Sequence, residues 1–190
     1  SFLSDRQQDK RRQQIKQVME RTEYADYWTL KWADVLMLNP EKMGPRGAYE
    51  FHHWLRQQIQ TNRPYDQWVR ELITASGNSG KYGPTNFFRA APTAEDLTKT
   101  VSQAFLGIRM DCAQCHHHPF ERWSQADYYG LAAVFARVGR KGGFADAEVP
   151  TNEVIYLKDK GPVVHPRSGL KIGPRPLGGP DFQLEQYSHL

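Results

Sequence analysis

Hydrophobic residues in the first two thirds of the chain recur at helical spacing and predict a series of α-helices. The first such segment spans residues 22–38. Its apolar positions include Tyr24, Trp28, Val35 and Leu38. Positions three, four and seven residues apart fall on one face of a helix, so this face is expected to be buried. Thr22 can cap the helix, and Pro40 is expected to end it.

Two further helices are predicted at residues 46–62 and 63–77. Pro64 is placed for a first helical turn and Gly77 for a C-terminal cap. The stretch 78–92 is rich in Gly, Pro, Asn and Ser, a composition typical of a loop.

Two capping boxes predict where the last helices begin. Thr93 is followed three residues later by Asp96, and the helix that they open runs directly into the two cysteines. Ser124 is followed by Asp127 in the same way and opens a helix that reaches residue 138. The segment with the cysteines is therefore expected to be a turn held between two helices.

The pattern changes at about Gly139, where Gly and Pro become frequent and helix is unlikely. Residues 152–157 and 162–166 are predicted to pair as a short hairpin. We therefore expect a mainly α, irregular multi-helix domain over residues 1–138. A Gly/Pro-rich extension, residues 139–190, is expected to pack on it.

Composition narrows the class of protein only slightly. The chain has 190 residues, 39% of them hydrophobic, and a net charge of +4, so it can bury a core and attracts acidic partners weakly. The cluster Lys10–Arg12 is interpreted as a solvated helix face, and nucleic acid is not an expected partner. Neither a transmembrane segment nor a signal peptide is predicted in this sequence.

The strongest chemical signal is the stretch "DCAQCHHHPF", residues 111–120, which holds both cysteines of the chain. Cys112 and Cys115 have the spacing that lets two thiols form thioether bonds with the two vinyl groups of one haem. The next residue, His116, is then placed as an axial ligand of the iron. The motif predicts haem c, with His116 as a metal ligand.

Three other interpretations stay open. A zinc or copper site could use the Cys/His cluster with a second ligand pair from elsewhere, and that pair would come from His52, His53, His165 or His189. A redox dithiol is expected beside a βαβ unit, which the sequence does not predict. A local disulfide or two buried thiols would be purely structural.

The run "FLGIRMDCAQCHHHPFERWSQADYYGLAAVFARV", residues 105–138, closely resembles a cytochrome-like domain family of unknown function from planctomycete proteins. Similarity to this family extends upstream through "YWTLKWADVL", "YDQWVRELITASG" and "NFFRA", and downstream through "VVHPRSGLKIGPRPLGG". The resemblance implies an exported haem protein, usually part of a longer chain with a C-terminal domain.

The resemblance also implies roles for single residues. Cys112 and Cys115 match the attachment cysteines, and His116 matches the axial ligand. His118 matches a second family histidine, interpreted as a hydrogen-bonding partner of a haem propionate or of the backbone. Arg122 could pair with a propionate or form an ordinary salt bridge. Tyr128 and Tyr129 follow at core spacing and are expected to pack in the core.

The opposite axial ligand is the least defined feature. The other candidates considered are Met37, Met43, Met110, His52 and His53. We place His165 first as a metal ligand, because it lies in a family-like run, and an open position second.

These expectations combine into a monohaem c-type cytochrome that transfers single electrons in the periplasm or otherwise outside the cytoplasm. Its redox partner is not identified, and we expect an electron carrier more than an enzyme. The alternatives are a peroxidase-like or ligand-sensing haem protein with an open iron position, or a scaffold module whose haem is structural.

Overall fold

Helices make up most of the chain that the structure describes, as the hydrophobic periodicity predicts. This computed structural model describes residues 2–143, 152–161 and 163–180. The α-helices are α1 (Lys10–Met19), α2 (Thr22–Val35), α3 (Pro40–Gln60), α4 (Tyr65–Ile73), α5 (Phe87–Ala90), α6 (Ala94–Leu106) and α7 (Gln125–Phe135). Two 3₁₀ turns are η1 (Gly83–Asn86) and η2 (Met110–Gln114). The strands are β1 (Gly77–Asn78), β2 (Val138–Gly142), β3 (Glu153–Leu157), β4 (Val163–Val164) and β5 (Lys171–Ile172).

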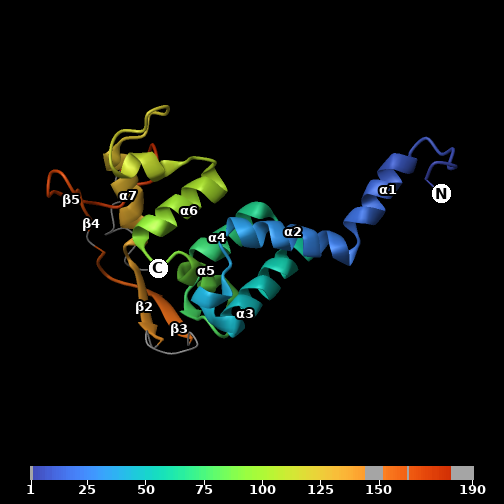
Figure 1. The fold of residues 1–190 in the computed structure, drawn as a ribbon, viewed down its shortest axis with the longest axis horizontal. Helices are drawn as coiled ribbons and strands as arrows, with labels where there is room; N and C mark the ends of the chain where they lie inside the picture. The colour runs from blue at the N-terminus through green and yellow to red at the C-terminus, as the bar shows by residue number, and fades with distance from the viewer. Residues whose placement is uncertain (1, 144–151, 162, 181–190) are drawn as a thin grey trace.

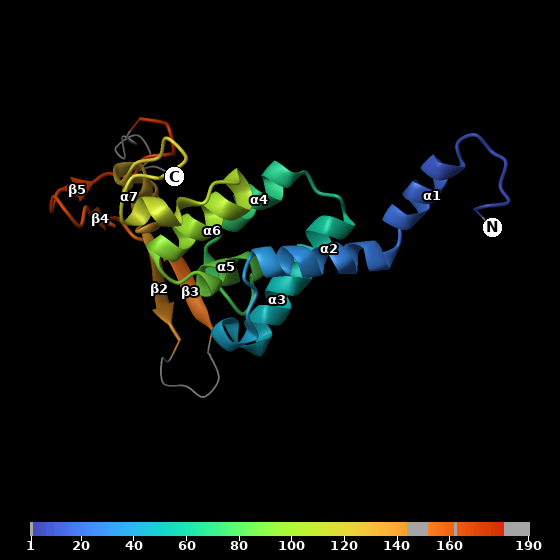
Figure 2. The same ribbon diagram turned by 45° about the horizontal axis from the view of Figure 1, so that its top comes forward.

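The elements are arranged along one long axis (Figures 1 and 2). Helix α1 projects from one end, α2 to α6 form the centre, and α7 lies with the strands at the other end. The main core is in the centre, where Phe51, Leu55, Leu72 and Phe87 are fully buried. Within the described residues, no helix is long and apolar enough to cross a membrane.

Helix α2 packs through small residues, and the predicted burial of Trp28 and Val35 is wrong, whereas Leu38 does pack against the core. Ala25, Thr29 and Ala33 are buried, whereas Trp28 is 42% exposed and Val35 is 47% exposed. Small side chains allow α2 to lie close to α3, so the large apolar residues are left on the outer surface. Periodicity alone could not choose between the two stripes.

Pro40 begins a helix and does not merely end one. It occupies the first turn of α3, and the side chain of Asn39 accepts a hydrogen bond from the Glu41 N–H. Helix α2 ends earlier, at Val35, and is followed two residues later by a left-handed residue, Met37, with φ of 55°. The Met37 N–H donates to the Asp34 carbonyl over 3.1 Å, which closes a helix C-terminus that usually contains glycine.

Replacing Met37 by glycine should therefore stabilise the protein. The left-handed conformation costs a residue with a β-carbon about 1 kcal/mol or more, and Met37 is 40% exposed, so little packing is lost. Glycine also raises the conformational entropy of the unfolded chain, which offsets part of this gain. The free energy of unfolding should therefore rise by about 0.5 kcal/mol. Urea denaturation measures the change. Met37→Ala is the matched control and should give no gain.

The stretch 78–92, predicted as a loop, contains two short helical elements and is largely buried. Helix α4 starts after Pro64 as expected, but it ends at Ile73, before Gly77, which lies in β1. The following residues form η1 and α5, and every residue of both is buried. Gly, Pro and Asn serve here to make tight buried turns against α3.

Arg89 of α5 is the most deeply buried charge in the part of the chain described. It is 2% exposed, and its Nη1 donates to the Met43 carbonyl and, over 3.3 Å, to Asn86 Oδ1. Its Nε lies 3.7 Å from the carboxylate of Glu153 in β3, which also pairs with Arg140 at 2.8 Å. This ion pair joins the helical centre to the C-terminal strands.

The strands pair differently from the predicted hairpin. Strand β3 lies between β1 and β2 in an antiparallel sheet, with Ile155 opposite both Gly77 and Arg140. Strand β4 forms its hairpin with β5, so the prediction that it pairs with β3 is wrong. Ile155 belongs to the main core, and the Arg175 N–H donates to the Gly130 carbonyl of α7 over 2.9 Å. The proposed division at residue 138 remains a prediction.

A polar cluster at Glu71 makes stability sensitive to alkaline pH. The Trp54 Nε1–H and the Tyr82 hydroxyl donate to Glu71, which also pairs with Arg63. Burial, followed by the bond to the Glu71 carboxylate, raises the pKa of Tyr82 from 10.0 to about 12.

The unfolded chain therefore loses the Tyr82 proton near pH 10, whereas the folded protein holds it until about pH 12. The stability that this raised pKa contributes is fully present below pH 10 and is lost as the pH rises from 10 to about 12. Tyr82→Phe should flatten the fall in stability measured by urea denaturation between pH 10 and pH 12. Tyr49→Phe changes an exposed tyrosine and should leave the slope unchanged. Equal slopes for Tyr82→Phe and the parent would contradict this assignment.

Candidate functional site

The two cysteines lie on η2, a short turn held between α6 and α7. Helix α6 starts with the predicted capping box of Thr93 and Asp96 and ends at Gly107, with φ of 67°. Helix α7 starts with the second predicted capping box, Ser124 and Asp127. Both helix starts are confirmed, so the sequence fixes the direction from which the chain enters and leaves the turn.

One side of the turn forms a small separate core. Met110 and Ala113 are fully buried against Trp123 and Tyr128. The Tyr128 hydroxyl is buried without a hydrogen-bond partner among the described residues, and burial raises the pKa of this tyrosine well above its usual range. Packing on this side holds the turn to α7 and leaves its other side, with Cys115 and His116, exposed.

Helix α7 also holds the turn through one carbonyl group. The Gln125 side-chain amide donates to the Gln114 carbonyl over 2.8 Å, and the Tyr129 hydroxyl donates to the same oxygen over 3.3 Å. Gln114 lies between the cysteines, so these bonds fix the backbone from which both thiols project. Gln125 was not predicted as a site residue, although its place in the first turn of α7 could have indicated this role.

Both thiols are accessible. Cys112 is half-buried, Cys115 is exposed, and neither forms a disulfide. The interpretations as a local disulfide or as two buried thiols are therefore wrong for this structure. The sheets are antiparallel, and the turn adjoins no βαβ unit in the ranges described, so the surroundings do not match a thioredoxin-like dithiol.

His116 is exposed and has a defined tautomer. Its Nδ1 lies 2.6 Å from the carbonyl oxygen of His117. A carbonyl only accepts, so in the neutral ring Nδ1 carries the proton and Nε2 keeps its lone pair. Histidines that bind metals are commonly oriented by a hydrogen bond of this kind from the other ring nitrogen. His117 contributes through its backbone, which needs no particular side chain.

The His118 ring joins the two ends of the cysteine turn through hydrogen bonds to the backbone. Its Nε2 lies 3.1 Å from the Arg109 carbonyl, and its Nδ1 accepts from the N–H groups of Phe120 and Glu121 over 3.3 and 3.0 Å. Both ring nitrogens are thus engaged with backbone on either side of the cysteines. This agrees with the backbone alternative for His118 and leaves no lone pair for a metal.

Arg122 stacks on a neighbouring ring. Its guanidinium carbon lies 4.7 Å from the ring centroid of Trp123. Among the described residues it makes no ion pair, so the salt bridge considered for it is not found, and Asp127 pairs instead with Arg175 at 3.6 Å. The Arg122 side chain is exposed beside the cysteine turn and available to an anionic group.

His165 is linked to the turn indirectly: its ring contacts the ring of Tyr129, which bonds the turn. The two ring centroids are 5.8 Å apart, and the Tyr129 hydroxyl is the one bound to Gln114. The His165 Nδ1 accepts from the N–H groups of Arg167 and Ser168, each over 3.3 Å. In the neutral ring the proton is therefore on Nε2, the opposite arrangement from His116.

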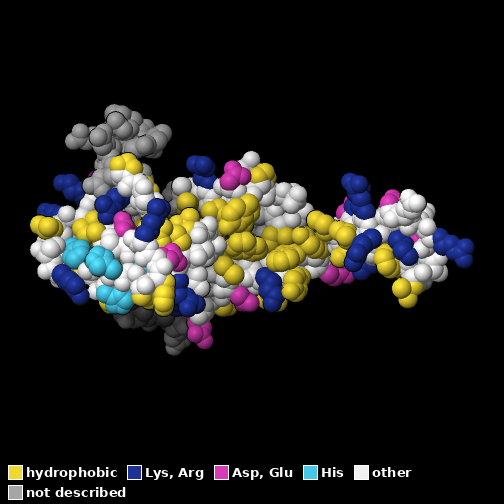
Figure 3. All heavy atoms as spheres, turned by 90° about the horizontal axis from the view of Figure 1, so that it is seen from above, with side chains coloured by type: hydrophobic (Ala, Val, Ile, Leu, Met, Phe, Trp, Pro, Cys, Tyr) yellow, Lys and Arg dark blue, Asp and Glu magenta, His cyan; other side chains and the backbone are white. Residues whose placement is uncertain are grey.

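The remaining candidate ligands are dispersed. His52 and His53 are exposed on α3, and His189 lies outside the described residues. Met43 and Met110 are fully buried in separate core clusters. In the described ranges no three His, Cys, Asp or Glu side chains come together as a metal site. Among the described candidates, the second ligand pair that a tetrahedral zinc or copper site requires is not assembled. On the face drawn in Figure 3, several histidine side chains lie at the α7 end of the molecule.

Fold and site define a mainly helical protein with an accessible C-x-x-C-H turn between two capped helices. Residues 1–140 match the PSCyt2 family, which is described as a protein of unknown function (DUF1549). The chain belongs to this family, which covers the helices, the cysteine turn and β2 up to Arg140. No curated protein and no solved structure shows significant similarity to the chain.

Proposed function

We propose that the cysteine turn binds haem c and that the protein carries single electrons. The observation that carries this proposal is the turn itself, which presents two free thiols and one histidine with a free Nε2 lone pair. The spacing of Cys112, Cys115 and His116 is the one that attachment requires. The buried side of the turn is tightly packed, which supports a rigid site on the exposed side.

The residues present fit this group. Cys112 and Cys115 would hold the haem covalently, and His116 would bind the iron through Nε2. Arg122 is exposed, stacks on Trp123 and would pair with a propionate. A bound haem supplies a one-electron iron couple, whose potential is set by the axial ligands and by burial. His118 keeps the turn in shape and does not touch the iron.

The position opposite His116 supports a second candidate function. His165 is the candidate that the sequence places first, but its Nδ1 is an acceptor, so in the neutral ring its Nε2 carries the proton. Binding iron through Nε2 would require that proton to leave and both backbone bonds to break. An open position, and with it a peroxidase-like or small-ligand-binding haem protein, is therefore a specific alternative.

The setting of the protein follows from the same chemistry. Haem c is attached on the outer side of the cytoplasmic membrane, so we propose a periplasmic or otherwise exported protein. We also propose that the protein exchanges electrons with a redox partner and that it belongs to a longer chain with a C-terminal domain.

The direct test is the intact mass of denatured protein after expression with haem c maturation machinery. We expect the mass of the polypeptide plus one haem, together with the pyridine haemochrome spectrum of two thioether bonds. A mass equal to the bare polypeptide would overturn the proposal.

The spectrum of the loaded protein separates the two candidate functions. If His165 is a ligand, the parent is low-spin, and His165→Ala becomes high-spin and binds cyanide readily. A parent that is already high-spin, with the same cyanide affinity as His165→Ala, would assign the open position. His53→Ala removes an exposed histidine of α3 and serves as the control.

A further inference from the structure

Helix α1 projects from one end of the molecule, at the opposite end from α7 (Figures 1 and 2). None of its residues is buried, whereas every other α-helix of the structure has buried side chains. The helix nevertheless contains three large apolar residues, Ile15, Val18 and Met19, which are 54%, 43% and 53% exposed. Packing in the core therefore does not explain why these residues are apolar.

The apolar residues of α1 lie on one face of the helix. Val18 and Met19 follow Ile15 by three and four residues, so the three side chains form one stripe. Arg11 and Arg12 precede Ile15 by four and three residues and continue the same face in the first turn. The opposite face carries the polar residues Lys10, Gln13 and Gln17. The helix is thus amphipathic, with two arginines at one end of its apolar stripe.

Helix α1 also carries the net positive charge of the chain. It contains the four cations Lys10, Arg11, Arg12 and Lys16 and no carboxylate, and the net charge of all 190 residues is +4. The remainder of the chain is therefore neutral overall. On the face drawn in Figure 3, Lys and Arg side chains gather at this projecting end.

The carboxylates at the two ends of α1 leave the arginines available. Asp9 accepts a hydrogen bond from the Gln13 side chain over 2.8 Å, on the polar face. Glu20 lies 3.9 Å from Lys16, and both side chains are exposed, so this pair is weak. Arg11 and Arg12 are exposed and form no ion pair with any residue that the structure describes.

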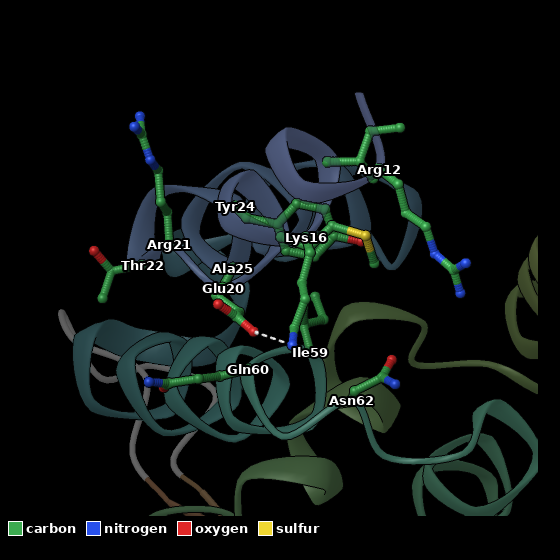
Figure 4. A pocket seen from close by; sticks show the side chains of 12 residues that line it. Arg12, Lys16, Glu20, Arg21, Thr22, Tyr24, Ala25, Ile59, Gln60 and Asn62 are labelled. Atoms are coloured by element: carbon green, nitrogen blue, oxygen red, sulfur yellow. Dashed lines mark ion pairs between the residues drawn. The ribbon is translucent and has the colours of Figure 1, made fainter. Parts of the chain in front are cut away.

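The apolar stripe borders open space between α1 and α3 (Figure 4). Ile15 and Met19 line a hollow of about 670 Å³, together with Tyr24 of α2 and Ile59 of α3. The charged residues of its lining are Arg12, Lys16, Glu20 and Arg21. A hollow with apolar walls and a cationic rim has space and charge for a molecule that is apolar at one end and anionic at the other.

We propose that α1 docks on the surface of a membrane that contains anionic phospholipid. Arg11 and Arg12 bind lipid phosphates, because a guanidinium group can donate two parallel hydrogen bonds to a phosphate. The apolar stripe enters the boundary between headgroups and acyl chains, as in other basic amphipathic helices. Acyl chains of the outermost lipids enter the hollow and cover Ile15 and Met19.

Other anionic partners match these residues less well. A protein that binds an amphipathic helix in a groove uses anchors at positions i, i+3, i+4 and i+7. The position seven residues after Ile15 is Thr22, which already belongs to α2, and the position seven residues before it is Gln8. Nucleic acid attracts the cations but leaves the apolar stripe in water. An anionic membrane uses both features of the helix.

The test is co-sedimentation of the chain with vesicles of phosphatidylglycerol and phosphatidylcholine in equal parts, and with vesicles of phosphatidylcholine alone. We expect binding to the anionic vesicles that weakens as salt is added, and little binding to the neutral ones. The result does not depend on haem, since α1 shares no residue with the cysteine turn. Equal binding to both kinds of vesicle, or to neither, would overturn the proposal.

Replacing Arg11 and Arg12 together by glutamine should weaken binding to the anionic vesicles at least tenfold, since each basic residue at such a surface contributes about fivefold. The matched control, Arg70→Gln with Lys81→Gln, removes two exposed cations outside α1 and should bind like the parent. If the Arg11 and Arg12 variant binds as tightly as this control, α1 is not the docking site.

A second pair of replacements tests the apolar contribution. Ile15→Ser with Met19→Ser keeps every charge and should weaken binding to the anionic vesicles about tenfold. Both positions are exposed, so circular dichroism should match the parent. Binding equal to that of the parent would mean that charge alone acts, as with any polyanion, and the membrane would be rejected as the partner.

Discussion

Protein in which both Cys112 and Cys115 are replaced by alanine should carry no haem that survives denaturation. Each thioether bond needs one thiol, so each single replacement should leave at most one bond and a shifted haemochrome spectrum. The expected change between parent and double variant is from one haem per chain to none. Intact mass after acid–acetone extraction measures it.

The double variant should still fold, which keeps the result interpretable. Cys115 is exposed and Cys112 half-buried, and replacements at such positions usually change stability by less than about 0.5–1 kcal/mol. The buried side of the turn, with Met110 and Ala113, is left intact. Circular dichroism should match the haem-free parent. Haem retained through extraction by this variant would contradict attachment at these residues.

Replacing Arg89 by leucine should lower the free energy of unfolding by about 3–5 kcal/mol, the cost of breaking a buried ion pair from one side. The change removes the buried donor to the Met43 carbonyl and leaves the Glu153 carboxylate with Arg140, at 2.8 Å, as its remaining partner among the described residues. Urea denaturation of both proteins gives the difference.

The matched control is Arg56→Leu. Arg56 pairs with Asp26 at 2.6 Å, but both side chains are partly exposed, so the loss should be below about 1 kcal/mol. If the two variants lose equal stability, Arg89 does not join the halves of the molecule in the way described.

Local signals in the sequence predicted local structure well. The capping boxes at Thr93 and Ser124 fixed two helix starts because each cap satisfies backbone groups within one turn. The predicted face of α2 was wrong because Trp28 and Val35 compete with a stripe of small residues for the core, and the shape of α3 decides. The buried turns after Gly77 were missed because Gly and Pro are common in both loops and tight packing.

Contacts distant in sequence could not be predicted from local pattern. Strand β3 pairs with β1, which lies more than seventy residues earlier in the chain. At the candidate site, spacing alone identified Cys112, Cys115 and His116. It could not give the hydrogen bonds that distinguish the ring tautomers of His116 and His165, because these depend on backbone carbonyl and N–H positions.

Pairing between β1 and β3 has a consequence for folding during synthesis. The ribosome releases α2 to α7 well before Glu153, so Arg89 is made long before its carboxylate partner. A chain arrested after residue 140, where the family match ends, would also lack Ile155 from its core. The emerging helices should therefore remain open to proteases until the third strand of the sheet arrives, and folding is completed late.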